Sequence, residues 1–420
     1  MMLKRQGIML ILALLATFIG LHFAFAPKAH DPRTTGTTML GGVAFLLITS
    51  SVVLSTRLAV FEEWFGGLDR MYQVHKVAGV VALIFVLVHF FGVPKELPAG
   101  TDPALNPLVP SAPLGMIALA LLVIGLALTL NRRISYNRWR PTHRVMGLVY
   151  VLIVGHFMTA PAIFFERFSA SGVLLIVAAV IGVIAYLYSI FGMNRATGKR
   201  YQIETVNALE RATEIVLKPI GDAITHKPGQ FAFIELQGKG WREPHPFTIS
   251  SEPGAERLKF TIKVLGDWTR KVREELSAGG EVIVRGPYGR FDMSKGGDKQ
   301  IWLAGGIGLT PFLSSVRAME KGDSRQIHLV YAAREEKDAV FLEELKHRAN
   351  QLGNVTLVPL FSQDGNFARV DIMKTKLPDP LSTYDYFLCG PKPMVEGLVH
   401  DLRNQGVNRS QIHTEAFEFR

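Results

Sequence analysis

Residues 72–93, YQVHKVAGVVALIFVLVHFFGV, are apolar for long enough to cross a lipid bilayer, yet they contain His75 and His89, 14 positions apart. A second apolar stretch holds His143 and His156, which are 13 positions apart. A histidine inside a bilayer is costly in free energy, so intramembrane histidines usually serve a function. Two matched pairs therefore indicate two metal centres stacked across a membrane.

Helical geometry decides which histidines can meet. His75 and His89 would lie about 21 Å apart along a helix axis and within roughly 40° of one face. His143 and His156 would lie about 20 Å apart but roughly 140° apart in azimuth, unless Pro141 places His143 in a first turn that departs from ideal geometry. Topology then pairs His75 with His143 near one membrane surface, and His89 faces His156 near the other. Facing imidazoles can clamp a haem iron from both sides, which favours electron transfer; satisfied polar histidines and a metal transport site are the alternatives.

Six apolar windows approach the roughly 20 residues that span a hydrocarbon core. They are residues 7–26, 38–60, 72–93, 112–130, 144–165 and 171–192. The first resembles a signal peptide, since Lys4 and Arg5 precede it, but its length and the five further spans favour a retained helix. Lys and Arg concentrate in the loops on one side of these spans. The positive-inside rule therefore predicts a multi-pass protein of the cell (inner) membrane with both termini in the cytoplasm.

Composition narrows the partners and the redox chemistry. The chain has 420 residues and a net charge of +10, but many basic residues fall in the juxtamembrane loops, so the expected electrostatic partner is anionic lipid rather than nucleic acid. Cys389 is the single cysteine, which excludes an intrachain disulfide and a cysteine-ligated iron–sulfur cluster. Redox chemistry here needs organic cofactors or haem. No obligate protein partner is evident.

The second half of the chain has the pattern of a soluble protein. Short alternating strands predict a small antiparallel β-barrel, at residues 203–204, 213–218, 230–236, 258–264 and 281–285. From about Lys299, strands and helices alternate as in a doubly wound α/β sheet. The strands are expected at residues 300–304, 327–332, 355–359, 384–389 and 411–417, and the helices at 311–321, 340–350 and 392–405. The predicted domains are a six-helix transmembrane haem bundle at 1–195, the antiparallel β-barrel at 196–297 and the α/β domain at 298–420.

Two groups of motifs in this half point to nucleotide-like ligands. The turn AGGIGLTP, residues 304–311, joins the first parallel strand to its helix, where glycines admit a pyrophosphate and the helix N-terminus offers free amides. In the barrel, the segments 245–250, 263–269 and 286–289 supply an aromatic face, hydroxyls, a cation and a helix start. An isoalloxazine with its pyrophosphate needs these groups, although turn chemistry and core packing are the alternative.

Taken in order, these motifs resemble the ferredoxin-reductase-type flavoprotein superfamily. With the histidine pairs, residues 38–420 resemble a membrane NADPH oxidase or ferric reductase, a family with the same unequal histidine spacing. The resemblance implies two haem b groups, held by His75, His89, His143 and His156. It implies that FAD is bound by His245, Pro246, Phe247, Thr248, Ser250, Lys263, Trp268 and Thr269, with Thr248 near the flavin ring.

The resemblance also places the nicotinamide nucleotide, NADPH or NADH. Its turn corresponds to Gly305, Gly306, Gly308 and Thr310, and the segment beside the nicotinamide corresponds to Cys389, Gly390 and Pro391. The aromatic residue that covers the flavin is expected to be Phe417, with Phe419 as the second candidate. The residues expected at the reacting groups are thus Thr248, Cys389 and Phe417. Arg334 could grip a 2′-phosphate and so favours NADPH, while Glu335 and Glu336 could repel that phosphate and select NADH.

The resulting interpretation is transmembrane electron transfer from cytoplasmic NAD(P)H through FAD and two haems. Oxygen, which would yield superoxide, is the first candidate acceptor, and a ferric chelate or a periplasmic reductase is the alternative. Animal oxidases carry a further histidine where this chain has Val93, and that departure weakens a dedicated superoxide role. A rival of another class is a metal or proton transporter regulated by nucleotide, which predicts no haem spectrum.

Overall fold

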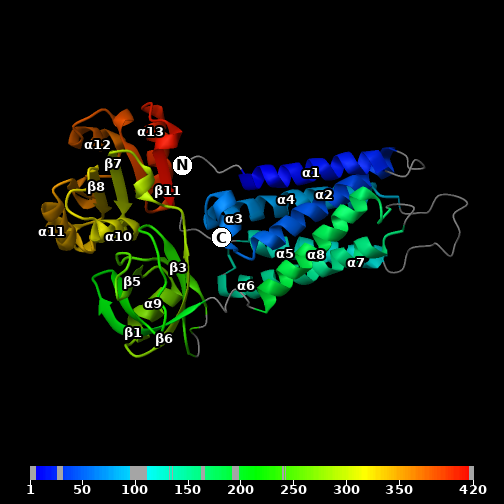
Figure 1. Cartoon of the computed structure of the whole chain (residues 1–420), viewed down its shortest axis with the longest axis horizontal. Coiled ribbons are helices and arrows are strands. Elements are labelled where there is room, and N and C mark those ends of the chain that lie inside the picture. The colour runs from blue at the N-terminus through cyan, green and yellow to red at the C-terminus, as the bar shows by residue number, and fades with distance from the viewer. Residues whose placement is uncertain are drawn as a thin grey trace, which may run out of the picture. The chain divides into compact units, whose positions relative to one another are not determined.

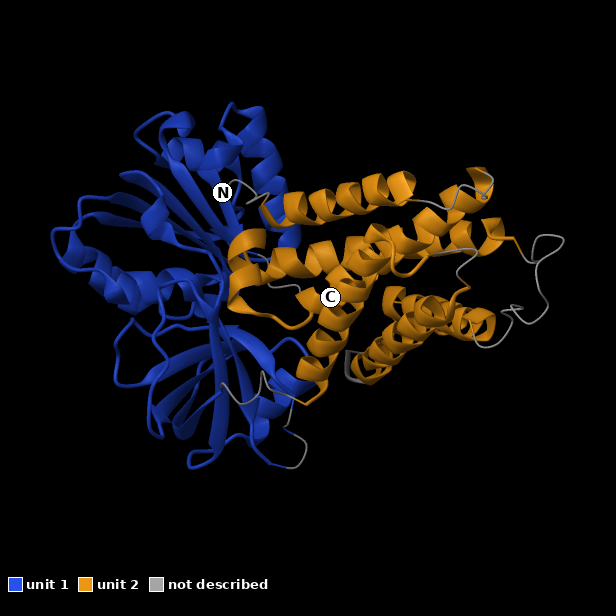
Figure 2. Cartoon of the chain, turned by 45° about the vertical axis from the view of Figure 1, so that its right-hand side comes forward, with its two compact units in different colours: residues 1–3, 195–419 blue, residues 4–194, 420 orange. Residues whose placement is uncertain are grey.

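The computed structural model describes the chain in several segments (Figure 1). They are residues 6–25, 32–94, 111–131, 133–134, 136–161, 166–191, 198–238, 241 and 243–415. The chain divides into two compact units, one built mainly from residues 4–194 and the other mainly from residues 195–419 (Figure 2). Each unit is described by itself below. The three predicted domain ranges stay a prediction.

The first unit is a bundle of apolar helices. In the described part of the chain, five helices are long and apolar enough to cross a membrane. They are α1 (Gln6–Phe25), α2 (Pro32–Leu54), α4 (Leu68–Gly92), α5 (Ser111–Leu130) and α8 (Ala170–Ile190). The predicted window 144–165 contains instead α7 (Met146–Thr159), of 14 residues. The helix ends there because Pro161 disfavours helical backbone at Ala160, whose ψ is 137°.

Two short helices that the hydropathy pattern did not predict lie between the long ones. α3 (Ala59–Phe65) follows α2, which ends at Leu54 rather than at the predicted residue 60; Arg57 has a left-handed φ of 59° between them. α6 (Tyr136–Arg144) precedes α7, and the backbone amide of Val145 between them bonds the carbonyl of Thr142 at 3.1 Å. His143 and His156 therefore belong to separate helices, which removes the azimuth conflict expected for one ideal helix.

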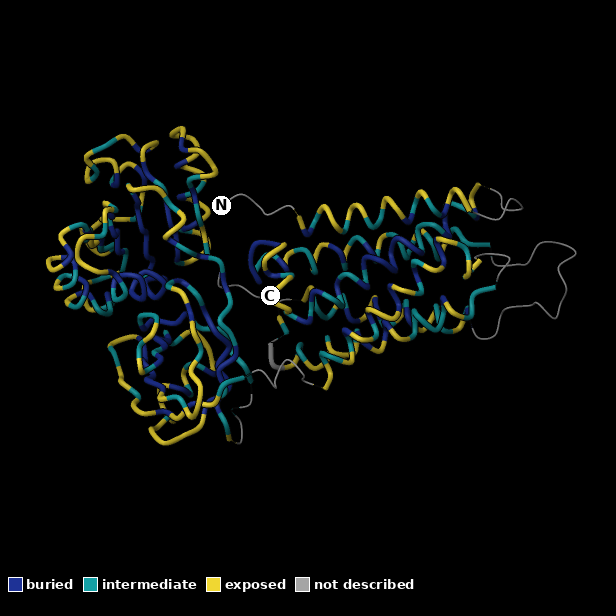
Figure 3. The backbone as a smooth tube through the Cα atoms, viewed as in Figure 1, coloured by how far each residue is buried: buried dark blue, intermediate teal, exposed yellow. Residues whose placement is uncertain are grey.

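Burial within this unit is concentrated on α2 (Figure 3). α2 packs against α4, α8 and α1, while α5 packs against α7. Apolar side chains on the outer faces of the bundle stay exposed, such as Met9, Phe91 and Ile184, each more than 60% exposed. A bundle with apolar side chains outside is suited to a lipid environment, where hydrocarbon replaces water as the solvent. The unit is that of a multi-pass membrane protein.

Two arginines close the ends of the helices that carry His89 and His156. The Arg33 Nε atom donates to the carbonyl of Gly92, the last residue of α4, at 3.1 Å. The Arg167 Nη1 atom donates to the carbonyls of Ala160, at 3.3 Å, and Met158 at the end of α7. The last carbonyls of a helix have no partner within it, so each cation completes a helix terminus. The charge pattern assigns this side of the membrane to the exterior, where arginines are uncommon. Their bonds to the helix ends explain why these two arginines lie there.

The second unit begins with an antiparallel sheet of six strands, in the order β4-β3-β6-β1-β2-β5. The strands are β1 (Lys199–Ala208), β2 (Ala212–Pro219), β3 (Phe231–Leu236), β4 (His245–Thr248), β5 (Leu258–Lys263) and β6 (Glu281–Tyr288). A bridge between Ile249 and Phe260 joins the two edges, so the sheet closes into a barrel. α9 (Asp267–Glu275) follows β5. The barrel prediction is confirmed, although β4 was not among the predicted strands.

The unit continues with a parallel sheet of five strands, in the order β11-β10-β7-β8-β9. The strands are β7 (Lys299–Gly305), β8 (Gln326–Ala333), β9 (Val355–Phe361), β10 (Asp385–Cys389) and β11 (Ile412–Glu415), and the helices are α10 (Thr310–Ala318), α11 (Leu342–Leu352), α12 (Val370–Lys376) and α13 (Lys392–Asn404). The chain starts in the middle of the sheet and winds outward first on one side and then on the other. This is the predicted doubly wound fold, and its strand order reverses between β7 and β10.

Candidate functional site

The segments predicted to bind the nicotinamide nucleotide meet at the carboxyl ends of β7 and β10. Ligands of open α/β sheets bind at such a reversal of strand order. Gly308 lies so close to β10 that a Cβ atom there would be 2.2 Å from the carbonyl oxygen of Cys389. A Cβ atom on Gly390 would likewise be 3.0 Å from the Cα atom of Gly305. The structure thus brings the predicted glycine turn against the predicted segment Cys389–Pro391.

The barrel contributes a cation to this edge of the sheet. Gly306 has a left-handed φ of 54°, which glycine adopts without strain, and a Cβ atom there would lie 3.7 Å from the Nζ atom of Lys263. The Thr310 hydroxyl donates to the carbonyl of Ile307 at 3.1 Å at the start of α10. The Lys263 ammonium, predicted for the FAD pyrophosphate, therefore lies beside the nucleotide turn and the N-terminus of α10.

The aromatic residues predicted to contact FAD form one stack on the barrel. The ring of His245 lies 4.1 Å from that of Trp268, between centroids, and the ring of Phe247 lies 5.7 Å from it with an angle of 22°. β4 supplies His245, Pro246 and Phe247, and α9 supplies Trp268. β4 pairs with β3, which fixes the positions of its side chains. The local strand and the following helix thus place these predicted residues side by side.

Two of the hydroxyls predicted for FAD, those of Ser250 and Thr269, have partners within the protein. The buried Ser250 hydroxyl accepts a hydrogen bond from Thr261 at 3.1 Å. The Thr269 hydroxyl accepts from the backbone amides of Leu265, at 2.9 Å, and Gly266, at 3.0 Å, and so closes the start of α9. Thr248 is buried at the end of β4. Thr269 therefore fixes the backbone before Trp268, while the Ser250 hydroxyl is fixed by Thr261.

A polar contact that the sequence did not reveal joins the barrel to the α/β sheet. Arg317 on α10 donates to the carbonyl of Ser250 at 2.8 Å and forms two bonds to Glu344, at 2.6 and 2.8 Å. The Ser314 hydroxyl donates to the carbonyl of Ser251 at 2.6 Å. These bonds attach the helix after the glycine turn to the loop after β4. Nothing in the local sequence marks them, because their partners are about 65 residues apart.

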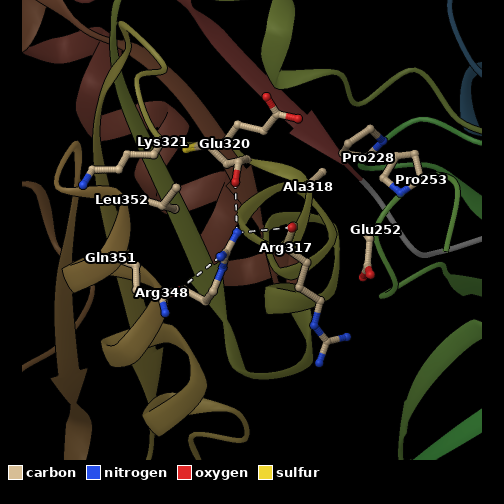
Figure 4. A pocket seen from close by; sticks show the side chains of 11 residues that line it. Pro228, Glu252, Pro253, Arg317, Ala318, Glu320, Lys321, Arg348, Gln351 and Leu352 are labelled. Carbon is tan, nitrogen blue, oxygen red and sulfur yellow. Dashed lines mark hydrogen bonds between the residues drawn. The ribbon is translucent and has the colours of Figure 1, made fainter.

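A cavity of this unit lies away from the predicted residues. It is lined by the end of α10, the C-terminal half of α11 and barrel residues such as Pro228 and Glu252 (Figure 4). In it, Arg348 donates to the carbonyls of Val316, Arg317 and Met319. Its lining among the described residues includes none of those predicted to bind FAD or the nucleotide. Arg348 there completes the C-terminus of α10. We therefore assign the cavity no role in the chemistry.

In the membrane unit, the four histidines form two facing pairs. The ring centroids of His75 and His143 lie 6.0 Å apart, and those of His89 and His156 lie 6.2 Å apart. Two imidazoles that bind one metal from opposite sides have centroids about 6 Å apart, because each metal–nitrogen bond is about 2 Å long and each ring centroid lies about 1 Å beyond its nitrogen. Both pairs therefore have the separation that a metal between them requires. His75 and His89 belong to α4, and their partners belong to α6 and α7.

The Nδ1 atoms of these histidines are all held by neighbouring helices. The Nδ1 atoms of His75, His89 and His156 lie 2.9 Å from the carbonyl oxygens of Ser51, Thr37 and Ser111, respectively. The fourth, that of His143, lies 3.3 Å from the Thr129 hydroxyl. A histidine that donates its Nδ1 proton presents the lone pair of Nε2, which is the usual arrangement of a metal-ligating histidine. The geometry fits a haem iron, which takes two axial protein ligands.

Glycines make room for the rings of His89 and His156. A Cβ atom on Gly41 would be 2.8 Å from the Nδ1 atom of His89, and one on Gly115 would be 2.8 Å from that of His156. Each glycine follows by four positions the residue whose carbonyl bonds the ring, Thr37 or Ser111. In an α-helix the carbonyl of residue i points toward residue i+4, so a ring bonded to it crowds that residue. Sequence reasoning missed both glycines.

The remaining predicted residues are placed as follows. Arg334 is exposed just after β8, and Phe417 and Phe419 lie outside the described residues. Cys389 is completely buried at the end of β10.

Comparison with known proteins agrees with this arrangement. Residues 40–154 match the ferric reductase like transmembrane component, residues 204–292 an FAD-binding domain, and residues 302–400 an oxidoreductase NAD-binding domain. The glycine betaine monooxygenase reductase subunit of Pseudomonas aeruginosa is 31% identical over 46% of this chain and 56% of the relative. The reductase component of the naphthalene 1,2-dioxygenase/salicylate 5-hydroxylase systems of a Ralstonia species is 30% identical over 51% of this chain and 68% of the relative.

Among solved structures, flavohemoglobin from Malassezia yamatoensis has a TM-score of 0.52 at 18% identity, covering 92% of this chain and 99% of that one. This likeness concerns the fold alone. The chain spans about half the length of the first curated relatives that it matches.

These matches show a transmembrane component of the ferric reductase like kind, followed by an FAD-binding domain and an oxidoreductase NAD-binding domain. The part of the chain that carries the FAD and NAD domains belongs to the same family as this Ralstonia reductase component, and residues 40–154 before it are similar to the ferric reductase like transmembrane component.

Cys389 is expected to be unreactive toward thiol reagents in the folded protein. Burial, and secondarily the charge of Glu415, raise the pKa of the Cys389 thiol well above its usual value, so the thiol stays protonated at neutral and mildly alkaline pH. Alkylation with iodoacetamide at pH 8, followed by mass spectrometry, should label Cys389 only after denaturation. Rapid labelling of the native protein would show that the carboxyl end of β10 opens.

Proposed function

We propose that this protein carries electrons from NAD(P)H through FAD and two bis-histidine b-type haems to an acceptor on the other side of the membrane. The observation that carries the proposal is the pair of facing histidine sites, with ring centroids 6.0 and 6.2 Å apart and every Nδ1 atom bonded to a neighbouring helix. A membrane unit with these sites and a unit with FAD and NAD domains together support NAD(P)H-driven electron transfer across the membrane.

Each histidine pair would hold one of the two haems. His75 and His143 would hold the inner haem, and His89 and His156 the outer one. Bound FAD supplies the change from two-electron to one-electron chemistry, and bound haem supplies the path across the bilayer. Because a pair of histidines would hold each haem iron, the acceptor is expected not to bind an iron directly.

The soluble unit would bind the two organic cofactors. The stack of His245, Phe247 and Trp268 offers FAD an aromatic surface, with Thr248 at the end of the same strand. The glycine turn with Lys263 beside it suits the pyrophosphate of the nicotinamide nucleotide. Cys389 lies against that turn and would border the nicotinamide. Phe417 keeps its predicted role as cover of the flavin.

We place the protein in the cell inner membrane with its soluble unit in the cytoplasm. The support is the charge pattern, since most basic residues of the loops lie on the side of His75 and His143. On the opposite side, Arg33 and Arg167 each complete a helix end. Anionic lipid would then face the basic loops.

Oxygen is the acceptor that we propose first, with superoxide as the product. A ferric chelate is the second candidate, and the match of residues 40–154 to a ferric reductase like component favours it. Val93, at the end of α4, stands where animal oxidases carry a further histidine. The identity of the acceptor is therefore part of the test below.

NADPH is the nucleotide that the residues after β8 favour. Glu335, which could repel a 2′-phosphate, has cationic partners, Lys337 at 3.1 Å and Arg211 at 3.7 Å. Arg211 also pairs with Asp338. Arg334 is exposed beside them, and its guanidinium group can form a bidentate pair of hydrogen bonds with a phosphate.

Stopped-flow spectroscopy of the purified full chain tests the proposal. Mixing with NADPH without oxygen should bleach the flavin bands first and then produce the bands of reduced six-coordinate haem; NADH should react more slowly. Addition of oxygen or of ferric citrate should reoxidise the haem. The compound that reoxidises the haem faster is then identified as the acceptor. A protein that holds no reducible six-coordinate haem would overturn the proposal in favour of a transporter or another role.

A further inference from the structure

One of the four histidines is held differently from the others. His75, His89 and His156 place Nδ1 against main-chain carbonyls at 2.9 Å. His143 places it against the side chain of Thr129, at 3.3 Å. A main-chain carbonyl is present whatever the side chain, whereas a hydroxyl depends on the residue at that position. The Nδ1 atom of His156 also lies 3.1 Å from the Ser111 hydroxyl, in addition to the Ser111 carbonyl. Among the four histidines, His143 is therefore the one whose Nδ1 contact relies on a side chain alone.

The bonding of the Thr129 hydroxyl determines the tautomer of His143. Its proton goes to the carbonyl of Gly125, at 2.7 Å, which is the shortest of its contacts. Its oxygen accepts from the Nε1–H of Trp139 at 3.0 Å. A hydroxyl has one proton and two lone pairs, so the remaining lone pair can only accept from His143. Thr129 thus holds the proton of His143 on Nδ1 and leaves Nε2 free toward His75.

Trp139 acts on the same hydroxyl and on the same ring. Its indole stacks on the imidazole of His143, with centroids 4.9 Å apart and an angle of 27°. Both residues belong to α6, which packs against α5, the helix of Thr129. Because the indole N–H and the imidazole N–H share one oxygen, each competes with the other for its electron density.

We propose that Thr129 is a positioning residue that orients His143 and, together with Trp139, tunes the redox potential of the inner haem. The proposal rests on the proposed function. Donation of the Nδ1 proton makes a histidine ligand more basic, and a more basic ligand stabilises the ferric over the ferrous state. Removing the Thr129 hydroxyl should therefore raise the potential of the inner haem, and removing the indole N–H of Trp139 should lower it.

Redox titration of the full-length haem protein, followed by absorbance, tests both directions. Thr129→Val keeps the shape of the side chain and removes the hydroxyl, so one of the two haem components should shift upward in potential. The ferrous-to-ferric ratio of that component at a fixed potential should rise about three- to tenfold, the usual effect of one hydrogen bond. Thr129→Ser restores the hydroxyl and should return the component toward the wild-type potential.

Trp139→Phe should shift the potential of the same haem component in the opposite direction. It keeps an aromatic ring against His143 and removes the indole donor, so the Thr129 oxygen becomes a better acceptor and the same component should shift downward. Thr159→Val is the matched control near the outer pair. Its hydroxyl donates to the main-chain carbonyls of Gly155, at 2.7 Å, and His156, at 3.4 Å, on its own helix. It bonds no imidazole ring among the described residues, so both components should stay in place.

The outcomes separate this inference from the proposed function. If two six-coordinate components are present but Thr129→Val moves neither, Thr129 has no electronic role and the inference is wrong. If Thr129→Val and Trp139→Phe shift the component in the same direction, a general loosening of the site explains the effect and the inference again fails. Absence of six-coordinate haem in the wild-type protein would instead overturn the proposed function itself.

Discussion

His89→Ala is expected to abolish electron delivery to the outer acceptor while the protein continues to oxidise NAD(P)H with soluble dyes. The substitution leaves His156 without its facing partner, since the two rings lie 6.2 Å apart in the intact pair. Reduction of oxygen or ferric citrate should fall by at least about 100-fold. Reduction of a dye at the flavin should stay close to wild type, because the inner pair and the soluble unit are unchanged.

The control for this experiment is His22→Gln. His22 is a buried histidine of α1 whose Nε2 atom lies 3.2 Å from the carbonyl of Thr35, a contact that an amide can replace. It has no role in the proposed path, so haem absorbance and acceptor reduction should be retained. If His89→Ala reduced dye and acceptor turnover equally, the assigned order of the centres would be wrong.

Gly308→Ala is expected to slow NAD(P)H oxidation in every assay, including those with soluble dyes. The added methyl group would lie 2.2 Å from the carbonyl oxygen of Cys389, a main-chain atom that cannot rotate away. The glycine turn must therefore shift from the end of β10, and a displacement of about 1 Å at a reacting site costs on the order of 100-fold in rate. Stopped-flow reduction of the flavin measures this effect.

The matched control is Gly397→Ala on α13. A Cβ atom at Gly397 meets nothing within 4 Å, so the substitution should leave the nucleotide site intact and stabilise the helix by about 0.5–1 kcal/mol. Reduction of the haems by dithionite should be normal in both variants. Normal NADPH oxidation by Gly308→Ala would contradict the placement of the nucleotide at this turn.

Much of the fold was predictable because it depends on local pattern. Apolar windows of about 20 residues located five of the long helices, and the alternation of strands and helices located the barrel and the parallel sheet. The errors occur where a single residue overrides hydropathy. Pro161 ends α7 early, and the break at Val145 separates α7 from α6, a helix that carries His143 and lies before the predicted span.

The sequence by itself determined the class of protein, since histidines at matched depth, a glycine turn after a strand and the order of the motifs are all features of the linear chain. Only the tertiary structure decided which residues hold the histidine rings in place. Thr129, Gly41 and Gly115 acquire their roles from the rotation of packed helices about their axes, which brings residues 14 to 52 positions apart into contact. Hydropathy records that a helix is apolar, but its packing geometry determines which backbone carbonyl or hydroxyl meets an imidazole.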